Sequence, residues 1–337
     1  MSSGGQELKI IEQMVRGLCY YEIEDSEKAY ACLKVLDGEW WRGSLQAEER
    51  ALIARGVATY GDVLCETGRQ ADAEQTYRSF LESNLTTVDR AVTGMVYRSL
   101  AALYANMQRW SEALDLYEKA GELLERWFDS GSVIEGTIRC QMALGKSDAA
   151  KSTLTSALLS QPTLEVRVPL YLVGAELAKM SNNRDEALSY LWEIKELVEH
   201  YPWRVEEDVL DSASLIAWNY KEVDLAYSIA RHVEVLDNYE CPAVSVFIMS
   251  LYAKNSFSDC IRVCDRVIRT PSAMGSVLDT AIKLKMYSQA RVDDSCILDG
   301  INLGDVRRLA KVDGDIRAFL KEHDVNIDLN GSDESTH

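Results

Sequence analysis

The sequence has few helix breakers and no long apolar run. It contains 5 prolines among 337 residues, and no stretch of 18 apolar residues occurs. Because proline removes a backbone donor and kinks a helix, its scarcity leaves long segments free to be helical. A membrane-spanning helix needs about 20 apolar residues, so none is expected. Residues 1–10 lack the basic region and apolar run of a secretory signal. With 47% hydrophobic residues, we expect a folded, cytoplasmic protein with no membrane partner.

Basic side chains are outnumbered. Lys and Arg total 36 against 54 Asp and Glu, which gives a formal charge of −18. Nucleic-acid phosphates attract an excess of basic groups, so we expect no nucleic-acid partner. The deficit is uneven, because residues 255–323 hold 11 basic and 10 acidic side chains. An acidic partner would therefore dock best on the C-terminal third. We favour the alternative that its basic residues form only a solvated helix face: Arg262, Arg266, Arg269, Lys283, Lys285, Arg307 and Arg308.

Sequence motifs typical of enzyme active sites and metal sites are missing. There is no glycine-rich phosphate loop, G-x-S-x-G elbow, H-E-x-x-H helix or CxxC pair. None of the 4 histidines lies within five residues of a cysteine, so a zinc site has no local frame. Cys260 and Cys264 share a helical face and could hold a soft metal or react with an oxidant, but packing of small side chains explains them better. We predict no metal, no cofactor and no enzymatic activity.

The sequence does contain a recurring helical pattern. Its clearest copy reads Tyr97-x-x-Leu100-Ala101-x-x-Tyr104, followed after a short turn by Ala113-x-x-x-Tyr117-x-x-Ala120. Spacings of three and four place the large residues on one stripe of a helix, and the small alanine lets a second helix approach closely. Equivalent small anchor residues recur along the chain at Ala29, Ala73, Ala150, Ala187, Ala226 and Cys260. The prolines are expected to separate the resulting hairpins: Pro162, Pro169, Pro202, Pro242 and Pro271.

The pattern resembles the tetratricopeptide repeat, in which W-x2-L-G-x2-Y on one helix precedes A-x3-F on the next. The resemblance implies an all-α, right-handed superhelical solenoid over residues 1–323, with about seven helical hairpins centred near residues 29, 73, 113, 150, 187, 226 and 260. Within it, residues 277–323 are expected to form a capping helix pair, because helical spacing continues over 277–289 and 303–323. Residues 324–337 are polar and acidic, which predicts a disordered tail.

In this family the first helix of each hairpin lines a concave wall. The resemblance implies that the wall here includes Arg55, Asp62, Arg98, Asn106, Arg139, Glu176, Lys179, Trp218 and Tyr252. Such a mixture of charged and aromatic residues suits an extended peptide or a helix. Some members grip a chaperone's C-terminal carboxylate with Lys and Asn, at places held here by Ala58 and Asp62 in one unit and by Arg98 and Ala102 in the next. That clamp is therefore not predicted.

Arg98 and Arg139 come from neighbouring units. They could hold an acidic group of a partner between them. The interpretation we favour is pairing within the chain, with Asp62, Glu135 or Glu176, because surface charges of opposite sign commonly pair.

Tryptophans give a second set of expectations. Trp40 and Trp41 form an unusual pair, which is either an exposed binding hot spot or, as we favour, filling between two loosely spaced hairpins. Trp110, Trp127 and Trp192 lie on helical stripes and are expected in the core.

These patterns together favour a protein that holds other proteins, as an adaptor or scaffold that binds a peptide or partner subunit in the groove. Two alternatives stay open. One is a structural subunit of a larger assembly, or a chain that associates with itself. The other is a peptide sensor that acts on a separate effector.

Overall fold

The computed structural model describes residues 3–37, 47–83, 86, 89–124, 130–160, 162–202, 205–236, 238–273, 275–293, 296–323, 325 and 327. Every regular element in these ranges is a helix, as predicted. The chain divides into two compact units, unit 1 (Met1–Val166) and unit 2 (Arg167–His337).

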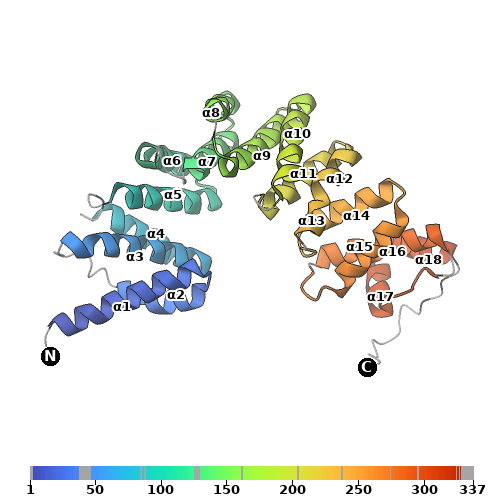
Figure 1. Ribbon diagram of the computed structural model, residues 1–337, viewed down its shortest axis with the longest axis horizontal. Helices are drawn as coiled ribbons and strands as arrows, with labels where there is room; N and C mark the ends of the chain where they lie inside the picture. Colours follow the sequence, from blue (N-terminus) through green and yellow to red (C-terminus); the bar gives the residue numbers. More distant parts are fainter. Residues whose placement is uncertain are drawn as a thin grey trace. The chain divides into compact units, whose positions relative to one another are not determined.

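Unit 1 is a series of antiparallel helix pairs (Figure 1). The first helices of the pairs are neighbours, since α1 contacts α3, α3 contacts α5 and α5 contacts α7. The elements are α1 (Ser3–Glu22), α2 (Ser26–Leu33), η1 (Lys34–Leu36), α3 (Ala47–Glu66), α4 (Gln70–Leu81), α5 (Arg90–Asn106), α6 (Trp110–Leu124), α7 (Ser130–Ala143) and α8 (Ser147–Leu159).

Unit 2 continues the pattern of helix pairs and then adds three further helices. The first helices are again neighbours, because α11 contacts α14 and α14 contacts α16. The elements are α9 (Leu164–Met180), which begins three residues before the unit, α10 (Arg184–His200), α11 (Glu207–Asn219), α12 (Val223–Ala230), α13 (His232–Val235), α14 (Ala243–Ala253), α15 (Phe257–Arg269), α16 (Gly275–Val292), α17 (Leu303–Val312) and α18 (Gly314–Glu322).

The small anchor residues control how closely the helices pack. All of them are fully buried: Ala29, Ala73, Ala113, Ala150, Ala187, Ala226 and Cys260. Each lies in a second helix, in α2, α4, α6, α8, α10, α12 and α15 respectively. Because a small side chain at the helix crossing removes little space, the backbones approach and larger residues such as Tyr77 and Phe80 fill the flanks.

One turn recurs before every anchor. A residue with positive φ stands five positions ahead of each, namely Glu24, Gly68, Gln108, Gly145, Asn182, Lys221 and Asn255. In the turn at Gly68, the amide of Arg69 donates to the carbonyl of Leu64, and the amide of Gly68 donates to that of Cys65. These two bonds define a Schellman motif, which satisfies carbonyls at the end of the first helix. The second helix therefore starts in the same direction at each turn.

Three expectations about elements and burial are corrected. Pro169 lies inside α9, because that helix already begins at Leu164 and proline is tolerated better near a helix start than in its middle. The helical spacing of 303–323 is split into α17 and α18 by Asp313, whose carboxylate accepts from the amides of Asp315 and Ile316 and caps α18. Trp192 is 49% exposed instead of buried.

The C-terminal helices have a core of their own in unit 2. Ile282, Met286, Val306 and Leu320 are among its buried residues, and Val325 and Ile327 pack against it. The other residues of the predicted tail, 324, 326 and 328–337, lie outside the described ranges.

Candidate functional site

The neighbouring first helices of unit 1 carry a series of charged side chains, which we call the charged row. Its members come from α1, α3, α5 and α7: Glu22, Arg55, Asp62, Glu66, Arg98, Glu135 and Arg139. Arg55, Asp62, Arg98 and Arg139 were predicted to line the groove. The structure brings these four onto adjacent helices of one unit.

Asp62 is the most constrained member of the charged row. The hydroxyl of Tyr77 donates to its Oδ1 at 2.5 Å, and Ser99 also hydrogen-bonds to it. Burial raises the pKa of this carboxyl, although these two bonds and the positive charge of Arg98 oppose the rise. Tyr77 belongs to the second helix α4 and is 1% exposed. Its ring reaches Asp62 across Gly61, where a Cβ atom would lie 2.2 Å from the ring.

Arg98 lies at the centre of the charged row. Its positive charge lowers the pKa values of Asp62, Tyr21 and Tyr117, against the larger raising effect of burial on each group. For Tyr117 the net result is a pKa of about 12. Because Tyr21 belongs to α1 and Tyr117 to α6, Arg98 is electrostatically linked to elements on both sides of α5.

Two other arginines of the charged row form ion pairs. Arg139 Nε lies 2.8 Å from Glu135 Oε1, which confirms the predicted pairing within the chain for this residue. Arg55 Nη2 lies 3.1 Å from Glu22 Oε1, with both side chains more than 60% exposed. Exposed pairs of this kind are worth less than about 1 kcal/mol. A partner's charges can therefore replace them at little cost.

The remaining predicted groove residues lie elsewhere. Asn106 is exposed at the end of α5, outside the charged row. Glu176 is half-buried and Lys179 exposed on α9. Trp218 and Tyr252 are half-buried on α11 and α14 in unit 2.

Trp218 and Tyr252 are part of a larger apolar surface, which we call the aromatic strip. It consists of Leu215, Trp218, Met249, Tyr252, Tyr287 and Phe319, on α11, α14, α16 and α18. The rings of Tyr252 and Tyr287 are 6.4 Å apart, and those of Tyr287 and Phe319 are 4.5 Å apart. Sequence reasoning found only two of its members. Leu215 and Met249 could have been found, since each stands eleven residues before its anchor, as Asp62 does in unit 1.

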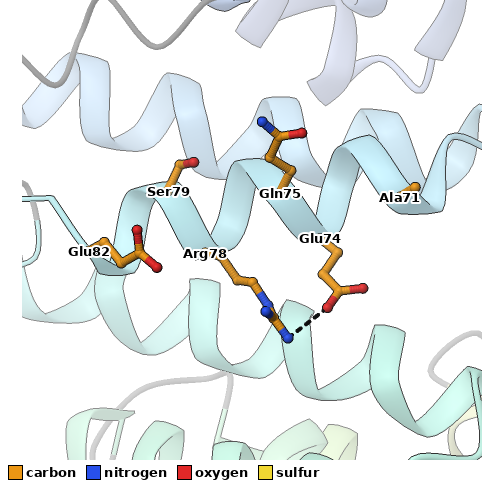
Figure 2. Close-up of a pocket in the computed structure, with 6 residues that line it drawn as sticks. All are labelled: Ala71, Glu74, Gln75, Arg78, Ser79 and Glu82. Carbon is orange, nitrogen blue, oxygen red and sulfur yellow. Dashed lines mark ion pairs between the residues drawn. The ribbon is translucent and has the colours of Figure 1, made fainter.

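Sequence reasoning did not find the hollow of about 370 Å³ beside α4 in unit 1. Figure 2 shows Glu74 and Arg78 directed to one side of the helix and Gln75 and Ser79 to the other. An ion pair of 2.9 Å joins Glu74 and Arg78, and Tyr104 hydrogen-bonds to both. The hollow is wide open and polar, which favours water over a small ligand.

Several basic residues of the C-terminal third pair with acidic residues of the chain itself. Lys285 is 2% exposed and pairs with Asp265 at 2.6 Å. Arg262 pairs with Glu234 and Arg308 with Asp279, each at 2.6 Å. Acidic neighbours of unit 2 itself thus neutralise much of this charge. Further predicted residues, Trp40, Trp41 and Trp127, lie outside the described ranges.

The described residues offer little for metal chemistry. Within them, no group of three or more His, Cys, Asp or Glu side chains lies close enough together to hold a metal ion. Cys260 and Cys264 are fully buried thiols, which confirms that they pack in the core. In the part of the chain described, no helix has the length and apolar character to cross a membrane.

Comparisons with known proteins bear on the fold. No family model matches the chain, and no curated protein matches it. Solved structures similar to it include the following three. A tetratricopeptide repeat protein from Parabacteroides merdae is 15% identical with a TM-score of 0.51, over 83% of this chain and 99% of its own. Yeast Tom70 is 13% identical with a TM-score of 0.56, over 93% of this chain and 64% of its own.

The third is a Signal Transduction ATPase with Numerous Domains protein from Pyrococcus horikoshii, which has a tetratricopeptide repeat sensor. It is 13% identical with a TM-score of 0.54, and the match covers 94% of this chain and 47% of that one. At these identities the likeness shows the fold alone. Together with the recurring anchors and turns, it identifies the chain as a helical repeat protein with the tetratricopeptide-like fold.

Proposed function

We propose that the chain is a non-enzymatic, cytoplasmic adaptor that binds a protein or peptide partner on the first helices of its repeats. The observation that carries the proposal is the charged row. Four neighbouring helices present charges of both signs on one surface. The Arg55–Glu22 pair is exposed and the Arg139–Glu135 pair is partly exposed, so a partner's charges can reach both.

The positioning of Asp62 and Arg98 supports the same conclusion. A surface that only needs to be soluble can leave its charges on flexible side chains. Here Tyr77 reaches through the gap at Gly61 to fix the carboxylate of Asp62. A preorganised charge costs less entropy on binding than a mobile one. The charged row therefore combines a fixed carboxylate at Asp62 with ion pairs at Arg55 and Arg139 that a partner can replace. This combination suits recognition of an extended segment.

The test is copurification of partners with the tagged chain from its native source, followed by mass spectrometry. Reversing Arg98 and Arg139 to Glu should reduce the captured partner at least tenfold, because like charges then face each other across the interface. A matched control reverses Arg184 and Arg262, which lie on second helices with side chains about half exposed and have the same charge. This control should retain the partner.

Circular dichroism must show equal helix content in both variants. If the Arg98→Glu, Arg139→Glu chain captures the partner as well as the unaltered chain does, the charged row is not the binding surface.

A further inference from the structure

The aromatic strip is unusually apolar for an accessible face. Leu215 and Trp218 stand three residues apart on α11 and therefore share one face of that helix. Leu215 is 49% exposed, and Trp218 and Tyr252 are half-buried. Trp218, Met249 and Tyr252 pack with their inner parts on the main core of unit 2. Each of these side chains is thus held in place while part of it stays accessible, as is typical of the residues that contribute most to binding at protein interfaces.

The strip continues without a break over three elements. The contacts run from Tyr252 on α14 to Tyr287 on α16 and to Phe319 on α18. Phe257 lies 5.5 Å from Tyr252 at one side, and His323 lies 4.4 Å from Phe319 at the other, measured between ring centroids. A surface that crosses successive helices is longer than one small ligand and fits a segment of polypeptide.

Three lysines stand near members of the strip in the sequence. Lys221 stands three residues after Trp218, in the exposed turn that ends α11. Lys254 stands two residues after Tyr252, but its Nζ atom lies 5.2 Å from the centre of the Tyr227 ring on α12 and pairs with Asp224, whose side chain is 85% exposed. Lys283 lies 5.8 Å from the centre of the Tyr287 ring and pairs with Asp313 at 2.9 Å. Lys221 makes no ion pair with any residue that the structure describes.

Two acidic residues of α11, Asp208 and Asp211, stand at the opposite end of the helix from Lys221, and Asp208 is exposed. Asp211 accepts a hydrogen bond of 2.5 Å from the amide of Ala243, and burial raises its pKa. Asp224 and Asp315, which pair with Lys254 and Lys283, have side chains 85% and 87% exposed. Of the three lysines, Lys221 is therefore the one that can pair with a partner's acidic group without displacing an acidic group of unit 2.

We propose that the aromatic strip binds a partner segment that carries aromatic or aliphatic side chains and an acidic side chain beside them. The apolar side chains lie on Trp218, Met249 and Tyr252, and the acidic one faces Lys221. The inference rests on the proposed function in that the occupant is a protein segment, but it concerns a surface separate from the charged row.

The test is selection of binders from a library of random 12-residue peptides on the immobilised full chain. Enriched peptides should be rich in Phe, Trp, Leu, Asp and Glu. Binding of the most enriched peptide, measured by fluorescence polarisation, should weaken at least tenfold with Trp218→Ala combined with Tyr252→Ala. Leu215→Glu should weaken it similarly, and because this side chain is half exposed, the variant should keep its fold. Equal thermal midpoints would verify that.

Two controls separate the contributions. Lys221→Glu should weaken the binding of the acidic peptide at least threefold. It should not change the binding of the same peptide with Gln and Asn in place of Glu and Asp. The charged-row variant Arg98→Glu, Arg139→Glu should bind the peptide normally. A result against peptide binding on the aromatic strip can thus be distinguished from a result against partner binding on the charged row.

Several results would overturn the proposal. They are enrichment of basic or non-aromatic peptides, no enrichment at all, and binding that ignores the strip substitutions. A dimer in light scattering that dissociates with Leu215→Glu would make a second copy of the chain the occupant. Tighter peptide binding after removal of residues 328–337 would make the chain's own end the occupant.

Discussion

The two units differ in chemistry at several equivalent places on their first helices. Eleven residues before the anchor, unit 1 has Leu18, Asp62, Ala102 and Arg139, whereas unit 2 has Glu176 and then Leu215 and Met249. The turns before the anchors are the same in both units. The anchors and turns thus specify the helix pair, and the residue eleven places before the anchor varies between charged and apolar types. The comparison teaches that one scaffold presents two surfaces, a charged row and an aromatic strip.

The difference between the units is largest where a charge is buried. In unit 2 the side chain of Lys285 is 3% exposed and pairs with Asp265, whereas the Arg139–Glu135 pair of the charged row has side chains 40% and 27% exposed. Asp265→Ala should lower the free energy of unfolding by about 3 kcal/mol, because it leaves a buried lysine without its counter-charge. The matched substitution Glu135→Ala in unit 1 should cost less than about 1 kcal/mol. Urea unfolding measures both.

Adding Lys285→Met to Asp265→Ala should restore most of the lost stability, since no buried charge is then left. Equal costs for Asp265→Ala and Glu135→Ala would remove this distinction between the units.

Close packing of glycine against tyrosine gives the next effect. Gly61→Ala should cost about 1 to 3 kcal/mol, because its Cβ would lie 2.2 Å from the ring of Tyr77, which is fully enclosed. Gly174→Ala in unit 2 should cost less, since the ring of Tyr190 is 2.9 Å away and half-buried.

Gly121→Ala serves as the control for helix propensity. A Cβ atom added at Gly121 would contact Val133 at 3.8 Å, so the substitution should raise the free energy of unfolding by up to about 1 kcal/mol. Thermal unfolding of the three variants tests the order. A stabilised Gly61→Ala chain would show that Tyr77 can move away, and Asp62 would then not be held in place.

The smallest effect is a pH dependence confined to unit 2. Burial lowers the pKa of His232, with a further lowering by Arg231 and an opposing effect of Glu199. Both ring nitrogens lack a hydrogen-bond partner among the residues described. The unfolded chain therefore binds the proton more readily, so stability is complete above about pH 6.5 and falls as the pH drops towards the folded value. Each unit of difference between the two pKa values is worth about 1.4 kcal/mol.

Hydrogen exchange measured by mass spectrometry at pH 7.5 and 5.5 localises this effect. After correction for the intrinsic exchange rate, peptides around α12 and α13 should lose protection at the lower pH, and His232→Leu should abolish the loss. Equal loss of protection in unit 1 would contradict the assignment to His232.

Few residues of the sequence were needed to predict the fold. A small residue with large neighbours at spacings of three and four was enough to locate all seven anchors, because a close helix crossing tolerates no larger side chain. The exceptions arose where a local signal was ambiguous. Pro169 was read as a helix boundary, although proline is accepted early in a helix. The helical spacing of 303–323 was read as one helix, although the carboxylate of Asp313 caps a second one.

The candidate surfaces were only partly predictable. The resemblance to the tetratricopeptide repeat placed Arg55, Asp62, Arg98 and Arg139 on first helices. That Tyr77 supports Asp62 could not be predicted, because the contact crosses from one helix to another through the space left by Gly61. The basic residues of the C-terminal third illustrate the same limit. Their number was visible in the sequence, but the burial of Lys285 and the pairing of Arg262 and Arg308 depend on neighbours far away in the chain.

The sequence by itself determined the helical class, the anchors and two of the turns, those with Gly68 and Gly145, because spacing and backbone freedom are local properties. Tertiary structure decided the rest. Glu24, Gln108, Lys221 and the two asparagines take the same positive-φ conformation without glycine, since the hydrogen bonds of the turn and the packing of the second helix outweigh a local cost of about 1 kcal/mol. It also decided that unit 1 carries fixed and paired charges and unit 2 a line of aromatic rings, because both depend on which side chains meet across neighbouring helices.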